Sequence, residues 1–160
     1  MPSKVYWIKN LDNSARLGIM ARPRGNDWLE DEIQALKSKK VDVLVSLLER
    51  SEILELNLED EKMYCEVYGI QYINFPIPDR GVPQDDIATL LKLLVQLVES
   101  GKSLVIHCRM GIGRSSIIAA AVLLKFGFGA TELMNDIGVV RGVNVPDTEE
   151  QINWLKLIQY

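Results

Sequence analysis

Hydrophobic and polar residues alternate along the chain in blocks that are typical of strands and helices following one another. Short apolar runs predict strands, and longer segments with apolar residues every three or four positions predict helices. The predicted strands are 4–8, 16–20, 41–46, 71–75 and 102–106. The predicted helices are 27–37, 52–56, 59–68, 83–100, 115–124, 131–140 and 148–159. Because strands alternate with helices, we expect an α/β fold with a central, mostly parallel sheet flanked by helices.

Two of the predicted helices differ clearly in their patterns. The segment 83–100 has a 3.6-residue apolar period, with Pro83 at its predicted start and Gly101 directly after its end. The segment 115–124 is apolar on nearly all sides, which indicates a helix that is buried on every face.

The segment between the strand 102–106 and the helix 115–124 carries a cysteine, two glycines and an arginine. It joins the carboxyl end of a strand to the N-terminus of a helix, where free backbone N–H groups and the helix dipole both favour an anion. Gly111 and Gly113 allow the backbone angles that turn several N–H groups inward. The sequence therefore predicts a phosphate-binding loop, and the absence of a following Gly-Lys-Ser/Thr excludes a Walker-type loop.

The residue types in this loop predict nucleophilic chemistry. The field that favours an anion also stabilises a thiolate, so we expect Cys108 to be nucleophilic near neutral pH. Arg114 can hold two phosphate oxygens with its planar guanidinium, which lysine cannot reproduce. Ser115 places a hydroxyl close to the sulfur. A purely structural cysteine is the alternative, but a core turn has no use for an arginine at this spacing.

From His107 to Ser115 the chain resembles the signature of the cysteine-dependent protein tyrosine phosphatase superfamily, which is His-Cys, five residues, Arg, then Ser or Thr. Nearly the whole chain resembles the compact dual-specificity phosphatases. Through the segments 43–49 and 76–83 it looks most like the kinase-associated phosphatase group, and many small prokaryotic members share this layout. The resemblance implies the cysteine-phosphatase fold and hydrolysis of phosphotyrosine through a cysteinyl-phosphate intermediate, with phosphoserine and phosphothreonine as further candidates.

The resemblance also implies a general acid on a proline-rich loop upstream of the cysteine. Asp79 lies in such a loop, 75–83, and is 29 positions before Cys108. It would protonate the leaving oxygen and then activate the water that hydrolyses the intermediate. Asp85 and Asp86 are weaker candidates, because the first turn of the next predicted helix favours carboxylates in any case.

The variable positions of the loop bear on the substrate. The predicted substrate-binding residues are Arg109, Met110, Gly111, Ile112, Gly113 and Arg114. Phosphoinositide phosphatases that resemble this loop usually have two or more basic residues at the variable positions, whereas this chain has Arg109 alone. A phosphorylated protein is therefore favoured as the partner. A phosphoinositide or other small phosphomonoester phosphatase and a non-catalytic phosphoprotein-binding module remain as alternatives.

Three further residues have two interpretations each. In the family, His107 would hydrogen-bond the loop backbone, and we expect this supporting role rather than proton transfer. Gln151 could position the hydrolytic water, but it also belongs to a capping box with Thr148, which we favour. Cys65 is expected to be a buried core residue, with a resolving thiol for oxidised Cys108 as the weaker alternative.

Composition sets limits on the remaining function classes. A chain of 160 residues with 48% hydrophobic residues predicts a single catalytic domain over 1–160. The net charge of -4 argues against binding to nucleic acid or an anionic membrane. Without ligand-like spacing of Cys and His, neither a metal nor a cofactor is expected. No signal peptide pattern follows Met1, and the longest apolar run is too short for a bilayer. Because a reactive thiol has to stay reduced, we expect a cytoplasmic location. We also expect a monomer.

Overall fold

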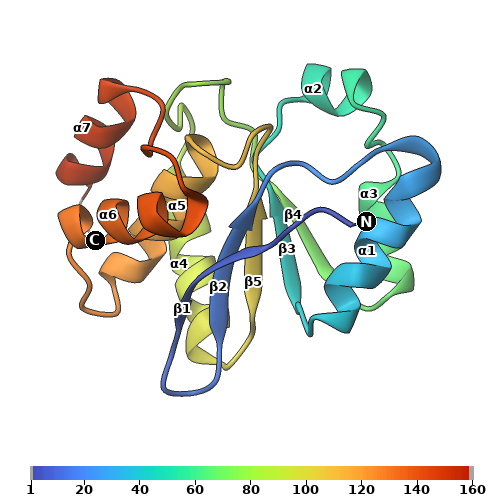
Figure 1. Cartoon of the computed structure of the whole chain (residues 1–160), viewed down its shortest axis with the longest axis horizontal. Coiled ribbons are helices and arrows are strands. Elements are labelled where there is room, and N and C mark those ends of the chain that lie inside the picture. The colour runs from blue at the N-terminus through green and yellow to red at the C-terminus, as the bar shows by residue number, and fades with distance from the viewer. Residues whose placement is uncertain (1, 159–160) are drawn as a thin grey trace.

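The computed structural model describes residues 2–158, in which helices cover both faces of a five-stranded sheet (Figure 1). The strands are β1 (Tyr6–Asn10), β2 (Arg16–Met20), β3 (Val43–Ser46), β4 (Gln71–Asn74) and β5 (Leu104–His107). The helices are a 3-10 turn (Asn26–Trp28), α1 (Leu29–Ser38), α2 (Arg50–Glu55), α3 (Glu61–Val67), α4 (Ile87–Glu99), α5 (Arg114–Leu124), α6 (Ala130–Arg141) and α7 (Glu149–Leu157).

The sheet has the strand order β1-β2-β5-β3-β4. β1 pairs with β2 in the antiparallel sense, and the pairs β2 with β5, β5 with β3 and β3 with β4 are parallel. The expected α/β fold with a mostly parallel sheet is therefore confirmed. The central strand is β5. Because β2 and β3 both run parallel to it, the carboxyl ends of these three strands lie at the same end of the sheet, where open α/β folds bind their ligands.

Two hydrophobic clusters lie on opposite faces of the sheet. Along β5, Leu104 and Ile106 belong to one cluster and Val105 to the other, as the alternation of side chains in a strand requires. The helices α4, α5, α6 and α7 cover the first face, and α1 and α3 cover the second (Figure 1).

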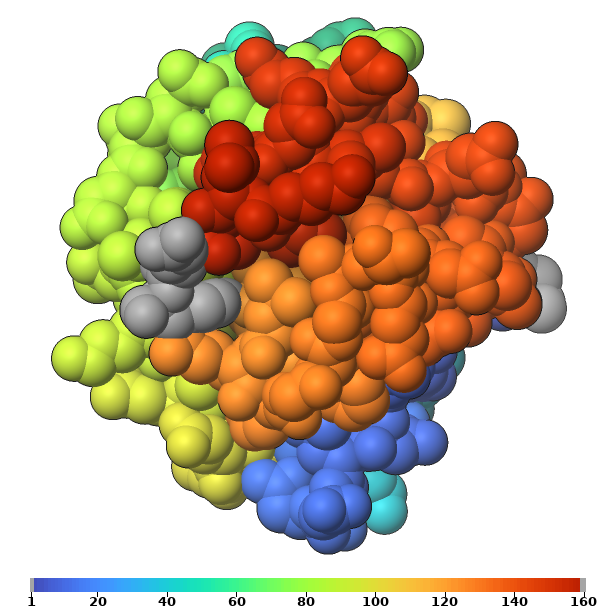
Figure 2. All heavy atoms as spheres, turned by 90° about the vertical axis from the view of Figure 1, so that its left-hand side faces the viewer, coloured from blue at the N-terminus to red at the C-terminus, as the bar shows by residue number. Residues whose placement is uncertain are grey.

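The helix α5 is buried over almost its whole length, as its apolar sequence predicted. It packs against α4, α6 and α7, and the outer surface on this side is formed largely by α6 and α7 (Figure 2). Within residues 2–158, no helix is long and apolar enough to cross a membrane.

The predicted start of the helix at Pro83 was wrong, because α4 begins at Ile87. Asp86 is the N-cap, and its carboxylate accepts hydrogen bonds of 3.0 Å from the backbone N–H of Ala88 and of 3.0 Å from the hydroxyl of Thr89. A capping aspartate satisfies N–H groups that have no partner within the helix, so the helix begins after it. Pro83 remains in the preceding loop.

Other boundaries differ by a few residues. The first strand begins at Tyr6 rather than at position 4. The helix predicted over 52–56 begins at Arg50, because Glu49 and Glu52 form a reciprocal capping box at its start. The predicted last residue of the final helix, Gln159, lies outside the described residues.

Candidate active site

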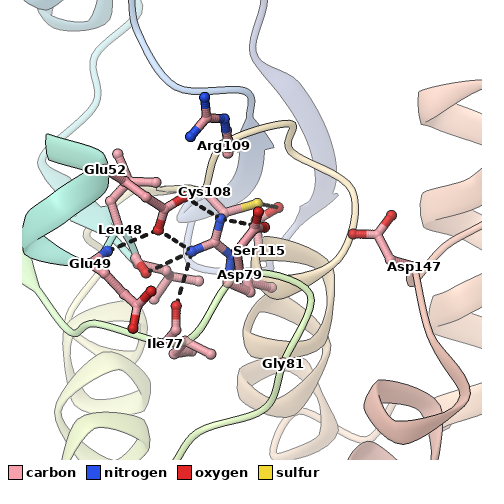
Figure 3. Close-up of polar contacts among 12 residues, drawn as sticks. Leu48, Glu49, Glu52, Ile77, Asp79, Gly81, Cys108, Arg109, Ser115 and Asp147 are labelled. Carbon is pink, nitrogen blue, oxygen red and sulfur yellow. Dashed lines mark hydrogen bonds and ion pairs between the residues drawn. The ribbon is translucent and has the colours of Figure 1, made fainter. Parts of the chain in front are cut away.

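A six-residue loop, 108–113, leads from the central strand β5 directly into the buried N-terminus of α5. Cys108 is the first residue of this loop and is 2% exposed. Its Sγ atom lies 3.3 Å from the hydroxyl oxygen of Ser115 in the first turn of α5 (Figure 3). The thiol therefore sits at the base of a loop whose free N–H groups and helix dipole favour a negative charge.

Both glycines of the loop have close neighbours, but of different kinds. Gly111 has a φ of 69°, in the left-handed region that favours glycine. A Cβ atom there would also lie 2.6 Å from the backbone of Met20 and Ala21. A Cβ atom on Gly113 would lie 2.3 Å from the Oδ2 atom of Asp147. A larger residue at position 111 would therefore strain the loop backbone, whereas one at position 113 would first displace the side chains of Asp147 and Gln151.

Arg114 is almost fully buried and its guanidinium is held by protein acceptors. The Nη1 and Nη2 atoms donate to the two carboxylate oxygens of Glu52 at 2.7 and 2.9 Å. Nη1 also donates to the carbonyl of Ile77 at 3.0 Å, and Nη2 donates to the Oδ1 atom of Asp79 at 3.0 Å. The guanidinium therefore has a fixed orientation next to the loop.

The charge state of Glu52 follows from these contacts. Burial raises the pKa of the Glu52 carboxyl, but the hydrogen bonds from Arg114 and from the backbone N–H of Glu49 outweigh it. The net result is a pKa of Glu52 below its usual value. Glu52 is consequently an anion at neutral pH and a permanent partner for the arginine.

The structure brings Asp79 to the same guanidinium. The Asp79 side chain is 53% exposed, whereas that of Arg114 is 2% exposed. The carboxylate therefore lies at the open side of the loop, close to Cys108 and Ser115 (Figure 3). By contrast, Asp86 is engaged as the N-cap of α4.

His107 lies beneath the loop and is fully buried. Its Nε2 atom is 2.6 Å from the Oε2 atom of Glu61, and its Nδ1 atom is 3.4 Å from the carbonyl oxygen of Cys108. Glu61 is also fully buried. The position fits a residue that supports the loop rather than one that meets the substrate.

Gln151 connects three segments around the site. Its backbone N–H donates to the hydroxyl of Thr148 at 3.2 Å, which is the N-cap half of the favoured capping box. The other half would need the Gln151 side chain on the N–H of Thr148, but that side chain binds Asp147 and Gly81 instead. The buried side-chain oxygen accepts from the backbone N–H of Asp147 at 3.0 Å. The side-chain nitrogen donates to the carbonyl of Gly81 at 2.9 Å, in the loop that carries Asp79.

The variable residues of the loop face outward. Arg109 forms two parallel hydrogen bonds of 3.0 Å with the carboxylate of Glu55. Met110 is 61% exposed and Ile112 is partly buried. Arg109 points away from Cys108 in Figure 3.

Arg141, at the end of α6, holds the loop from its outer side. Its Nε atom donates to the carbonyl of Gly111 at 2.9 Å, and its Nη2 atom donates to the carbonyl of Met110 at 3.1 Å. The guanidinium also lies 4.2 Å from the ring centroid of Tyr6. In a loop whose N–H groups turn inward, carbonyls turn outward, and Arg141 satisfies two of them.

Sequence reasoning missed the roles of Glu52, Glu61 and Arg141. The two acids lie near helix starts and the arginine ends a helix, where the helix dipole favours such charges in any case, so their positions give no local signal of a role in the site. The capping box at Glu49 and Glu52 was a readable signal for the start of α2, but it does not reveal the contact with Arg114.

Cys65 belongs to the hydrophobic cluster on the face of the sheet opposite to that of Cys108. Burial, together with the nearby charges of Glu61 and Glu66, raises the pKa of Cys65 to about 12. The position agrees with the expected core residue. Among the described residues, no cluster of three or more His, Cys, Asp or Glu side chains could hold a metal ion.

The fold and the loop between β5 and α5 define a cysteine-dependent phosphatase of the compact dual-specificity type. Residues 18–128 match the family described as "Polymorphic toxin system, DSP-PTPase phosphatase". This match covers more than half of the chain, and the chain belongs to this family.

Individual relatives agree with this class. The chain is 26% identical to cyclin-dependent kinase inhibitor 3 of Rattus norvegicus, over 96% of this chain and 77% of the relative. A crystal structure of kinase associated phosphatase with its catalytic-site cysteine replaced by serine has a TM-score of 0.85 at 23% identity, covering 97% of this chain and 93% of that chain. Tk-PTP in its active form has a TM-score of 0.74 at 25% identity, covering 94% of each chain. The resemblance to the dual-specificity phosphatases is confirmed.

Proposed function

We propose that the protein removes phosphate from phosphotyrosine residues of a protein substrate, with phosphoserine and phosphothreonine as further substrates. One observation carries the proposal. The sulfur of Cys108 lies 3.3 Å from the hydroxyl of Ser115 at the base of the loop, next to an arginine that a buried carboxylate holds in place.

In the first step, the thiolate of Cys108 attacks phosphorus, so that an S–P bond forms as the bond to the ester oxygen breaks. Arg114 and the inward N–H groups of the loop stabilise the charge on the phosphate oxygens. Asp79 gives its proton to the leaving oxygen. The products are the dephosphorylated hydroxyl and a cysteinyl phosphate.

In the second step, the Asp79 carboxylate accepts a proton from a water molecule that attacks phosphorus. The S–P bond breaks, and its electron pair returns to Cys108 as a thiolate. The hydroxyl of Ser115 is placed to donate a hydrogen bond to this sulfur, and inorganic phosphate leaves.

The rim of the loop supports a protein substrate over a phosphoinositide. Arg109 is the basic residue among the variable positions, and the carboxylate of Glu55 faces it. A headgroup with several phosphates would therefore find a single basic residue at the variable positions of the loop, and that residue already has a counter-ion. We propose a single catalytic domain over 1–160 and a cytoplasmic location, where a catalytic thiolate stays reduced.

The test is the replacement Cys108→Ser, which keeps the loop but substitutes a hydroxyl that stays protonated at neutral pH. Turnover of a phosphotyrosyl peptide should be lost while binding of the peptide persists. Cys65→Ala is the matched control and should retain activity, because Cys65 lies on the other face of the sheet. Substantial hydrolysis by the Cys108→Ser variant would refute the covalent mechanism.

The substrate class is tested separately with phosphotyrosyl, phosphoseryl and phosphothreonyl peptides and a phosphoinositide at equal concentration. We expect the phosphotyrosyl peptide to have the highest kcat/KM. A higher value for the phosphoinositide would replace the protein substrate with a lipid. A chelator should have no effect, and activity that zinc or magnesium restores would indicate another enzyme class.

A further inference from the structure

Two carboxylates of α2 each pair with one arginine of the site, Arg114 at the start of α5 and Arg109 in the loop, but they do so in different environments. Glu52 pairs with Arg114, and the two side chains are 7% and 2% exposed. Glu55, three positions later, pairs with Arg109, and these side chains are 60% and 33% exposed. The first pair is part of the interior, whereas water reaches the second.

This difference in exposure decides which pair a ligand can open. Breaking the buried pair would leave a charge without a partner in the interior, which is strongly unfavourable. An exposed pair is weak, because water competes for both groups and salt screens them. Arg109 can therefore exchange Glu55 for another anion, while Arg114 keeps Glu52.

The Glu55 carboxylate indicates which ligand chemistry suits Arg109. Its two oxygens accept two parallel hydrogen bonds of 3.0 Å from the Nη1 and Nη2 atoms. A carboxylate or phosphate group of a ligand offers the same pair of oxygens to the guanidinium. Arg109 belongs to the loop that begins at Cys108 and its guanidinium lies at the exposed rim, so such a group would bind at the rim of the site rather than at the sulfur.

A free anion competes poorly with Glu55, which is attached to the same protein. An anion on the same substrate as the reacting phosphate competes much better, because binding at the loop raises its effective concentration at Arg109. The exchange therefore selects for substrates with two anionic groups close together.

We propose that Arg109 is a second anion subsite and that Glu55 is the competing counter-ion that sets its selectivity. The preferred substrates are phosphopeptides with an acidic or phosphorylated residue beside the residue that loses its phosphate. This inference rests on the proposed protein phosphatase function.

The experiment compares kcat/KM for three phosphotyrosyl peptides that differ only in one adjacent residue: glutamine, glutamate or phosphoserine. Release of each phosphate is followed by mass spectrometry. The enzymes are the wild type, Glu55→Gln, Arg109→Gln, the double variant and Glu59→Gln. Glu59 is exposed, and its replacement removes the same charge four positions further along the chain.

In Glu55→Gln, the preference for the peptides with glutamate or phosphoserine over the glutamine peptide should rise severalfold. Arg109→Gln should abolish the preference, and the double variant should behave like Arg109→Gln. Glu59→Gln should match the wild type. The glutamate and phosphoserine arms show whether a carboxylate or a second phosphate is the better ligand.

Two results would overturn the inference while leaving the proposed function intact. One is an equal rise in preference in Glu59→Gln and Glu55→Gln, which would indicate a general effect of charge. The other is an unchanged preference in Glu55→Gln, or a raised preference that remains in the double variant that also lacks Arg109. If an aryl phosphate is hydrolysed but no peptide is, the protein phosphatase function and the inference both fail.

Discussion

The guanidinium of Arg114 serves the site through its shape as well as its charge. Its terminal nitrogens bind both oxygens of Glu52 and also reach Ile77 and Asp79. A lysine keeps the positive charge but has one nitrogen, so it cannot hold Glu52 with two parallel bonds and clamp a phosphate as well.

Arg114→Lys should therefore lower kcat/KM for an aryl phosphate by about 150- to 25 000-fold, if two hydrogen bonds to charged groups of roughly 1.5–3 kcal/mol each are lost in the transition state. Arg109→Lys is the control, because this residue is partly exposed at the rim. It should reduce the rate much less. Equal losses in the two variants would mean that the phosphate clamp is not Arg114.

Asp79→Asn tests the assignment of the general acid. General acid catalysis contributes about 10²–10⁴-fold and matters most when the leaving oxygen is basic. The variant should therefore hydrolyse a phosphotyrosyl peptide far more slowly, but an aryl phosphate with a good leaving group only moderately more slowly. The basic limb of the pH–rate profile should flatten, while the acidic limb should persist.

Asp85→Asn is the control for this experiment, since Asp85 is an exposed carboxylate in the loop before α4. It should leave both limbs unchanged. A flattened basic limb in Asp85→Asn, together with a bell-shaped profile in Asp79→Asn, would move the acid to the start of α4.

Glu52 should make the stability of the protein depend on pH. Its pKa in the folded protein lies below the ordinary value of 4.5, so its contribution to stability is complete above pH 4.5 and is lost as the pH falls through the lowered pKa. Glu52→Gln should be less stable than the wild type at pH 7 and should lose less stability on acidification. Urea unfolding at pH 7 and in the acidic range measures both effects, and an identical loss in the two proteins would contradict the assignment.

At the residue scale, the local pattern predicted the contiguous residues of the site, the resemblance was needed for Asp79, and the buried partners of Arg114 and His107 were missed. Cys108, Arg114 and Ser115 were predicted because one loop and one helix start contain them. The partner of Arg114 is 62 positions away and the partner of His107 is 46 positions away. A local pattern predicts neither pair, because each pair forms only when particular strands and helices become neighbours in the fold.

At the scale of elements, the apolar period predicted that the helix α4 exists, but a side-chain cap decided where it starts. In the segment before α4, both Pro83 and Asp86 are start signals. The aspartate determines the boundary because its carboxylate forms hydrogen bonds with the first turn. A periodic pattern contains no information about these bonds.

The helix α6 should contribute to phosphate binding through Arg141. Arg141→Gln removes the guanidinium that binds the carbonyls of Met110 and Gly111. The inhibition constant for vanadate should rise and kcat/KM should fall, with Arg141→Lys between this variant and the wild type. Tyr6→Leu removes the stacking partner but keeps both hydrogen bonds, so its effect should be smaller. Unchanged vanadate inhibition in Arg141→Gln would show that the contact does not position the loop.

At the scale of the whole molecule, the sequence predicted the α/β class but not the strand order. Alternating strands and helices imply helices on the faces of a parallel sheet. The order β1-β2-β5-β3-β4 places the last strand of the chain in the centre. Such pairing depends on contacts between segments far apart in the sequence, and the pattern of a single strand does not specify its neighbours.

The sheet also separates the two cysteines. Cys108 packs in the cluster with α4 and α5, whereas Cys65 packs in the cluster with α1. With its pKa raised to about 12, Cys65 is almost entirely a protonated thiol at neutral pH. Iodoacetamide should therefore modify Cys108 in the native protein, vanadate should protect it, and Cys65 should react only after unfolding.

Peptide mapping by mass spectrometry identifies the modified residue. An intramolecular disulfide between Cys65 and Cys108 in mildly oxidised native protein would show that the sheet does not keep these thiols apart.

The contact between Asp79 and Arg114 has a consequence for affinity. In the free protein, the Asp79 carboxylate occupies an N–H group of Nη2 that a phosphate oxygen could otherwise use. A phosphate that binds there must first displace this carboxylate, so Asp79 and the phosphate compete for the same N–H group of Arg114. Replacing Asp79 with asparagine should therefore tighten binding of inorganic phosphate even as turnover falls. The Asp79 carboxylate thus weakens binding of inorganic phosphate while it raises turnover, and this weaker binding helps the product to leave.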